Sequence, residues 1–284
     1  MPTLLLILVS LLGAGAPVEG IAVDAGWGSS ATWDDGRAEV ARYEATRVVY
    51  GEPRRFETVM ITVKEDLDAR TAVKADPPYE GRDLIGVLKI NILSTIPAGN
   101  YDYRYMTSVF VRREDPLTLV KLTSSSQEWC GTTFKEVVAW DGPPRLVHHS
   151  YWDGQADGTR PLPVGREALL EEQLIAVARA ARMEPGVPSR FRLHPTLITN
   201  SAPVTEWRQV TARLEGRETL KTAAGTFEVR RIDVRDAGGA GGSPALMTFW
   251  IEEAPRAAVV AMETSDGRSW KLKEIARRDY WTRS

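Results

Sequence analysis

The stretch RAEVARYEATRVVYGEPRRFETVMITVK, residues 37–64, decides the fold class of this sequence. Its two arms are rich in β-branched and aromatic residues, and alternate positions from Val59 to Val63 are Val or Ile. Gly51-Glu52-Pro53 lies between the arms and supplies a turn. Two such arms around a Gly/Pro turn are typical of an antiparallel β-hairpin.

The same pattern of short strands and polar or Gly/Pro breaks continues along the chain. Tyr101, Tyr103 and Tyr105 occupy alternate positions, so we expect them to form one row on a single face. Further strands are expected over 84–96, 117–123, 132–140, 145–152, 187–197, 205–216, 226–236, 245–253, 256–264 and 268–279. This spacing favours an antiparallel meander of roughly ten to twelve strands, and a sheet that long curls because of its twist.

One segment, residues 166–183, has the periodicity of a helix instead. Its apolar stripe consists of Leu170, Leu174, Val177 and Ala181, and Glu184-Pro185-Gly186 stops the pattern. Its other face carries Glu171, Glu172, Arg179 and Arg182. The sequence therefore predicts a mainly β protein, with one large curved antiparallel sheet and a single amphipathic helix on its concave face.

The N-terminus predicts export. Leu4–Leu12 is an apolar run that is too short to span a bilayer as a helix but suits the core of a signal peptide. Val18-Glu19-Gly20 and Val23-Asp24-Ala25 both fit a small-residue cleavage rule. The alternatives are a buried N-terminal strand and a misplaced start codon.

We take residues 1–25 as the signal peptide and 26–284 as a single β-rich domain. The proline-containing stretch 160–165 is the best candidate for a joint between two halves. No cysteine follows the apolar run to carry a lipid anchor, and no second stretch approaches the length of a membrane span. We therefore expect a periplasmic or secreted protein without a transmembrane segment in the mature chain.

Composition excludes several classes of protein. The chain has 284 residues, with 36 Lys+Arg against 38 Asp+Glu, and a pI near 6.0. That balance supplies no broad basic surface, so we expect no nucleic-acid partner. Cys130 is the one cysteine of the sequence, which excludes a disulfide framework and a multi-thiolate metal site.

Two groups of motifs carry a resemblance to known proteins. The residues Ala223–Val229, a glycine loop, Phe249-Trp250-Ile251 and a final hairpin resemble bacterial exported proteins of unknown function. These are similar in fold to the LolA/LolB-type lipoprotein carriers, which are half-barrels with an apolar concave face partly plugged by helices. The resemblance implies the same half-barrel fold and brings no catalytic residues with it.

The N-terminal half carries the second part of the resemblance. Trp33–Val40, Tyr50–Arg54 and Ser125–Gly131 look like stretches of exported Bacteroidota-type proteins. Such proteins often bear the label of septum-formation inhibitor. True members of that nucleotide-pyrophosphatase family are cytosolic α/β proteins, whereas this sequence predicts an exported β protein.

The most unusual stretch is Gln127–Gly131, which contains Cys130. With His148 or His149 on a later strand and Glu128 nearby, a Cys–His–carboxylate nucleophile is one interpretation. The alternative, which we favour, is that Cys130 is a small buried residue packed beside Trp129.

We expect no metal site and no cofactor. His148 and His149 are adjacent, so on a strand their side chains point to opposite faces and cannot share one ion. His194 is distant in the sequence, and no spacing typical of zinc ligands occurs.

Aromatic residues give the best candidate for a ligand site. Aromatic side chains with a polar tip suit a pocket for an amphipathic ligand, although they can equally fill the core beneath the helix. One short helix is too small to cover so wide a sheet, so we expect at least a partial cavity. The residues expected to line it are Tyr101, Tyr103, Tyr105, Trp140, Trp152, Leu170, Leu174, Val177, Trp250 and Trp270.

Three functions follow from these observations. The first is a non-enzymatic binding or carrier module that holds a lipid or another amphipathic small molecule in the half-barrel. The second is an envelope hydrolase or transferase that uses Cys130. The third is a non-catalytic scaffold whose sheet edge or aromatic patch docks an envelope protein partner.

Overall fold

The computed structural model describes residues 16–203, 205–239 and 243–282, so the expected signal-peptide core at 4–12 lies outside the described residues. The helical segments are α1 (Ala25–Gly28), the 3-10 turn η1 (Ala31–Asp34) and α2 (Leu174–Ala180). The strands are β1 (Val18–Glu19), β2 (Ala38–Val49), β3 (Glu52–Asp68), β4 (Leu84–Pro97), β5 (Asp102–Arg112), β6 (Leu119–Gln127), β7 (Thr132–Val138), β8 (Arg145–His149), β9 (Gly158–Pro161), β10 (Ala168–Leu170), β11 (Ser189–His194), β12 (Arg208–Thr222), β13 (Gly225–Asp236), β14 (Met247–Glu252), β15 (Val259–Thr264) and β16 (Ser269–Arg278).

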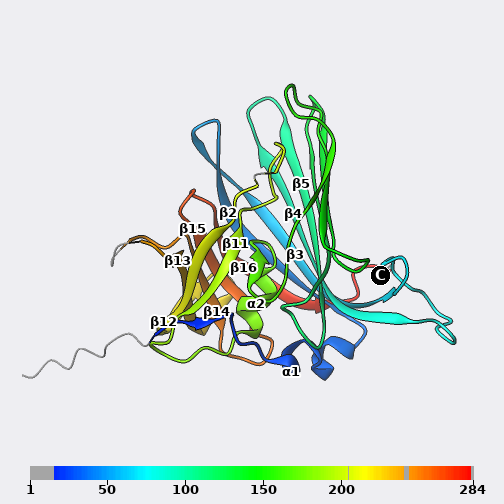
Figure 1. Ribbon diagram of the computed structural model, residues 1–284. Coiled ribbons are helices and arrows are strands. Elements are labelled where there is room, and N and C mark those ends of the chain that lie inside the picture. The colour runs from blue at the N-terminus through cyan, green and yellow to red at the C-terminus, as the bar shows by residue number, and fades with distance from the viewer. Residues whose placement is uncertain (1–15, 204, 240–242, 283–284) are drawn as a thin grey trace, which may run out of the picture.

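All of these strands belong to one 16-stranded sheet, which is curved but not closed. Strands β2 to β9 form one meander, β11 to β16 form a second, and the pairing of β16 with β2 joins the two. In the described chain β1 and β10 pair with β11 in parallel, and the other pairs are antiparallel. Figure 1 shows the sheet bent around α2. The predicted fold class is confirmed, and the additional strands are short ones such as β1, β9 and β10, which carry too few residues to show alternation.

The hairpin of residues 37–64 forms as expected. Its turn is at Tyr50 and Gly51, which have φ values of 54° and 79°, as a two-residue hairpin turn requires. Pro53 pairs with Val48 and so belongs to β3 rather than to the turn. Met60 is buried on the concave face.

The predicted helix over 166–183 is wrong in length. Residues 168–170 form β10, which pairs with 192–194 of β11, and the helix α2 occupies only Leu174–Ala180. The backbone amide of Glu171 donates to the His194 carbonyl at 3.2 Å. Pairing with the sheet edge therefore overrides the helix propensity of this stretch, as tertiary contacts often do. At the other end, Ala181 leaves the helix and bridges to Val23.

The helix α2 also lacks the solvated face that the sequence predicts for it. It lies on the concave face as expected, but every residue from Leu174 to Ala180 is buried. Arg179 is only 1% exposed and pairs with Glu39 of β2, with nitrogen and oxygen 2.9 Å apart. Its guanidinium also donates to the carbonyls of Ala257 and Arg256 and lies over the rings of Trp27 and Trp33. These contacts satisfy the buried charge, which would otherwise be too costly to bury.

A second segment, residues 195–203 between β11 and β12, also crosses the concave face, and we call it the strap. Its backbone carbonyls accept hydrogen bonds from side chains of β2 and β7. Lys135 Nζ donates to Leu197 at 3.0 Å, Arg47 Nη2 to Ile198 at 2.7 Å, and Thr133 Oγ1 to Asn200 at 2.7 Å. Because irregular backbone needs such partners when it is covered, these polar side chains explain how a loop can lie inside the sheet.

Residues 18–25 are part of the folded domain. β1 pairs with β11, Ile21 is 5% exposed, and Val23 bridges to Ala181. These contacts of residues 18–23 had no signal in the sequence, and the boundary expected at residue 25 stays a prediction. Signal cleavage itself stays a prediction. Residues 160–165 lie where the chain leaves β9 at one sheet edge and crosses to β11 near the other, and a joint at this place stays a prediction. Among the described residues, no helix has the length and apolar character to cross a membrane.

We predict that a chain starting at residue 26 is less stable than one starting at residue 16. The shorter chain loses the buried Ile21 side chain, and burial of an isoleucine is worth about 1.5–3 kcal/mol. Urea unfolding of both chains should give a free energy of unfolding lower by about 2 kcal/mol or more for the shorter one. Equal midpoints and slopes would show that residues 16–25 add nothing to the fold.

Candidate ligand-binding site

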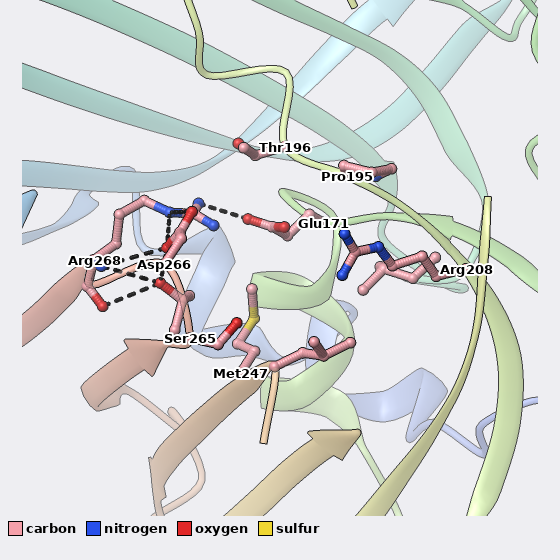
Figure 2. A pocket seen from close by; sticks show the side chains of 11 residues that line it. Glu171, Pro195, Thr196, Arg208, Met247, Ser265, Asp266 and Arg268 are labelled. Atoms are coloured by element: carbon pink, nitrogen blue, oxygen red, sulfur yellow. Dashed lines mark hydrogen bonds and ion pairs between the residues drawn. The ribbon is translucent and has the colours of Figure 1, made fainter. Parts of the chain in front are cut away.

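A pocket of about 170 Å³ opens beside the strap, and we call it the mouth (Figure 2). Its walls come from the strap, from the turn between β15 and β16, from the first residues of β12 and β14, and from the segment before α2. The lining residues with polar or flexible side chains include Glu171, Thr196, Arg208, Met247, Asp266 and Arg268.

Arg268 anchors one wall of the mouth. It follows a tight turn in which Gly267 has φ of 85°, a conformation that favours glycine. Its Nε donates to Asp266 at 2.9 Å and its Nη1 donates to Glu171 Oε1 at 2.6 Å. Figure 2 shows this guanidinium between the two carboxylates. The pair Arg268–Glu171 thus ties the last hairpin to the segment that leads into α2.

The charges of this group follow from burial and pairing. Burial raises the pKa of Glu171, and the charge of Arg268 opposes that rise. Burial also works to raise the pKa of Asp266, but the hydrogen bonds and charge of Arg268 bring that pKa below its usual value. Burial by itself lowers the pKa of Arg268, but the two neighbouring carboxylates raise it overall, so this guanidinium stays charged.

Arg208 supplies a cation with no partner. It is the first residue of β12, pairs through its backbone with Leu193, and is exposed. Its side chain forms no hydrogen bond or ion pair with any residue of the described ranges. In Figure 2 its guanidinium lies at the mouth, on the side opposite Arg268. It is therefore free to bind a carboxylate or phosphate group of a ligand.

An apolar inner cavity adjoins the mouth. The two share Glu171, Thr196, Met247 and Arg268 in their walls. The inner cavity is otherwise lined mainly by Ile92, Ile175, Ile198, Phe249, Met262 and Trp270. Its volume is only about 20 Å³. The broad hollow expected between sheet and helix is therefore largely filled, because the strap and α2 together occupy the concave face.

Buried polar groups hold the strap over this cavity. Glu172, which is 3% exposed, accepts hydrogen bonds from the Thr196 hydroxyl at 2.6 Å and from the Leu197 amide at 2.7 Å. Lys135 is fully buried and its Nζ donates to the Thr199 carbonyl at 2.7 Å. Burial lowers the pKa of Lys135 to about 8, while the nearby Glu172 charge opposes the shift.

The tyrosine row forms, but it does not line one cavity. Tyr103 and Tyr105 are buried in an apolar cluster with Val49 and Ile96, against which Ile198 of the strap packs. Tyr101 instead lines a separate hollow at the hairpin tips. The sequence alternation predicted the shared face correctly, but it could not show that the strap covers it.

The predicted tryptophans are spread over the sheet. Trp270 lines the inner cavity, as expected, and is 9% exposed. Trp250 packs against the main core and its indole N–H donates to Glu218. Trp140 packs against a second small core, and Trp152 contacts Tyr151. Of these four, Trp270 alone lies in the walls of the mouth or the inner cavity.

The helix residues predicted for the site are core residues. Leu170, Leu174 and Val177 are at most 3% exposed and belong to the main apolar core. None lies in the walls of the mouth or the inner cavity, and Ile175 faces the inner cavity instead. The prediction that these three residues line a cavity assumed a longer helix with one buried stripe, and the two cavities do not include them.

The Cys–His–carboxylate arrangement is not assembled. Cys130 is exposed, in the turn between β6 and β7, and its Sγ lies 3.9 Å from the Tyr101 hydroxyl. His148 lies opposite Lys135 in the body of the sheet, and Glu128 accepts a hydrogen bond from Asn200 at 2.7 Å. The favoured alternative of a buried cysteine is also wrong, because the turn places both Cys130 and Trp129 at the surface.

Several residues of the site had no signal in the sequence. Arg208, Met247 and Glu171 come from three separate segments, and no motif joins them. Arg268 follows the break between the strands expected at 256–264 and 268–279, but its ion pair depends on the position of Glu171. In the described ranges no group of His, Cys, Asp and Glu side chains could hold a metal ion.

No protein-family model and no curated protein matches the sequence. One solved structure is similar to this chain, a β-barrel-like protein of a domain of unknown function, DUF1849, from Brucella abortus. The two share 10% sequence identity with a TM-score of 0.46, over 86% of this chain and 98% of the other. The resemblance to the LolA/LolB carriers stays a prediction.

We predict that Lys135 makes stability depend on pH in the alkaline range. The folded protein releases this proton near pH 8, whereas an unfolded lysine keeps it to about pH 10.4. The unfolded state therefore binds more protons between these values, and the free energy of unfolding rises with pH across that window.

Urea unfolding of the wild type and of Lys135→Met between pH 7 and 10 measures this effect. The stability advantage of the wild type should grow from about pH 8 upward. Lys271→Met, at an exposed position on β16, is the matched control and should leave the pH profile unchanged. A stability advantage of the wild type that stays constant or falls with pH would contradict the lowered pKa of Lys135.

Proposed function

We propose that this protein is a non-enzymatic binding module for an anionic amphipathic molecule with a single apolar chain. The anionic head binds Arg208 in the mouth, and the chain enters the adjoining inner cavity between α2, the strap and the sheet. The observation that carries the proposal is this junction of an unpaired cation with an apolar interior.

The chemistry of the walls supports this ligand class. Arg208 has no hydrogen-bond or ion-pair partner among the described residues, so a ligand anion replaces water there and breaks no ion pair with them. Met247 and Met262 offer flexible, polarizable side chains that adapt to an apolar chain. Each apolar Å² that the chain removes from water contributes about 25 cal/mol, which favours a ligand with a tail over a small polar anion.

The volumes constrain how the ligand enters. Pockets for small molecules have volumes of about 300–1,000 Å³, and the mouth has about 170 Å³. A full chain therefore fits only if the strap moves. The strap is attached through hydrogen bonds from Lys135, Arg47 and Thr133 to its carbonyls, and its Thr196 and Ile198 line the inner cavity. We propose that ligand binding displaces the strap outward.

We also propose that the protein acts outside the cytoplasm, in the periplasm or as a secreted protein. The apolar run Leu4–Leu12 supports export. A carrier for amphipathic molecules has a physical role in such an aqueous compartment, because it shields the apolar chain from water. An envelope protein that delivers or receives the ligand is the partner expected in this proposal.

We predict that delipidated protein binds a fluorescent fatty acid, 11-(dansylamino)undecanoic acid, with increased dansyl emission. Arg208→Ala should weaken binding about threefold to tenfold, because an exposed charged contact is worth roughly 1 kcal/mol. Met247→Trp should reduce binding further by filling the wall that the mouth and the inner cavity share. A fluorescence titration measures the affinity of the wild type and of both variants for this fatty acid.

Arg55→Ala is the matched control, since Arg55 is exposed on β3 and lies outside the walls of both cavities. It should bind like the wild type. Hydrogen exchange of residues 195–203 should increase when the ligand is bound. Absence of binding to the wild type, or equal binding by all variants, would remove the proposal.

A further inference from the structure

A second hollow lies at the tips of two neighbouring hairpins, away from the mouth. It is formed by the turn between β4 and β5 and the turn between β6 and β7, and its volume is about 400 Å³. That volume is within the range of about 300–1,000 Å³ for small-molecule pockets. The hollow is open and lined mostly by polar groups, unlike the apolar inner cavity beside α2.

An aromatic platform forms one side of this hollow. Trp129 is 80% exposed, although tryptophan is usually well buried. Its ring stacks on Tyr101 with centroids 5.5 Å apart and planes 19° apart, so Tyr101 holds the indole in place and leaves its other face free. The four-residue turn that carries Trp129 is closed by the Glu128 amide, which donates to the Gly131 carbonyl at 2.9 Å. The free indole face is therefore exposed on a fixed support.

Polar side chains without partners surround the platform. Asn100, Asp102, Arg104 and Gln127 are exposed in the lining of the hollow. None of these four side chains forms a hydrogen bond or an ion pair with another residue in the part of the chain that the structure describes. Arg104 and Gln127 lie opposite each other on β5 and β6. Together they offer amide, carboxylate and guanidinium groups, which include both donors and acceptors.

Glu128 adds a buried acceptor at the same place. Its Oε1 accepts from Asn200 of the strap, while its Oε2 is buried and has no hydrogen-bond partner in the described chain. An unsatisfied buried carboxylate oxygen is costly, so it marks a position where a ligand hydroxyl would be stabilised. Burial raises the pKa of Glu128, and the Asn200 hydrogen bond opposes that rise.

The charges select among ligand classes. Asp102 and Glu128 oppose the single cation Arg104, so the hollow does not attract phosphate groups or an anionic lipid surface. A neutral molecule fits better when it combines an apolar face of C–H groups with a rim of hydroxyls. The C–H groups are attracted to the negative face of an indole ring, and hydroxyls both donate and accept.

We propose that the hollow at the hairpin tips is a saccharide-binding site, in which a sugar ring stacks on Trp129 and its hydroxyls bond to Asn100, Asp102, Arg104 and Gln127. This site is separate from the mouth and does not depend on the function proposed for it. The protein then holds an amphipathic ligand in one place and a neutral glycan in another.

Isothermal titration calorimetry of the full protein with chitotetraose, cellotetraose and maltotetraose tests the proposal. At least one tetrasaccharide should bind the wild type at millimolar concentration or below. Trp129→Ala should weaken that binding about tenfold or more, because a stacked aromatic contact and its buried area are lost. Gln127→Ala should weaken it about threefold, through one lost hydrogen bond.

Two matched variants separate this site from other effects. Trp281→Ala removes a tryptophan that is 53% exposed at the C-terminal end and should leave saccharide binding unchanged. Arg208→Ala should also leave it unchanged, even though it weakens binding of the fatty acid. Trp129 is so exposed that its removal should preserve the circular dichroism spectrum and the urea midpoint.

Three results would overturn the proposal. The first is that none of the tetrasaccharides binds the wild type at millimolar concentration. The second is that Trp129→Ala binds as the wild type does. The third is co-sedimentation with vesicles of phosphatidylethanolamine and phosphatidylglycerol that Trp129→Ala abolishes, which would assign the platform to membrane contact.

Discussion

The buried ion pair between Arg179 of α2 and Glu39 of β2 is the contact on which the interior of this protein depends. Its atoms lie 2.9 Å apart, with side chains 0% and 2% exposed. A charge buried in this way is tolerated only when its polar atoms are paired. The guanidinium meets that condition through Glu39, Thr62 and the carbonyls of residues 256 and 257. The pair therefore fixes one short helix at one position inside the curved sheet.

The position of α2 determines what space remains on the concave face. Ile175 of the helix and Ile198 of the strap meet Trp270 of the sheet around the inner cavity, and Glu172, just before the helix, holds the strap through the Leu197 amide. Every residue of the helix is buried, most of them in the apolar core, whereas the strap combines the buried Leu197 side chain with hydrogen bonds to its backbone. Of the two segments that fill the sheet, the strap is the one that moves in the function we propose. A fixed helix and a moving strap are the arrangement by which we propose that a nearly filled half-barrel binds its ligand.

Local patterns in the sequence were sufficient for the strands and insufficient for the interior. Alternation and turn residues predicted the hairpin at 37–64 and the tyrosine row, because these depend on neighbours along the chain. The ends of the helix depend on residues 168–170 pairing with β11, which no local pattern encodes. The same holds for Arg179, which the helical periodicity places on a solvated face, and for the mouth, whose residues come from distant segments. Cys130 is at the surface because its turn projects beyond the sheet, and a turn gives no information on burial by itself.

A double-mutant cycle on Glu39 and Arg179 tests the central claim most directly. Free energies of unfolding are measured in urea for the wild type, Glu39→Gln, Arg179→Met and the double variant. If the pair fixes the helix, each single substitution leaves an unpaired buried group and costs about 3–5 kcal/mol. The double variant then loses less than the sum of the two, with a coupling of about 1–3 kcal/mol. Additive effects, or single substitutions that cost less than about 1 kcal/mol, would contradict the account.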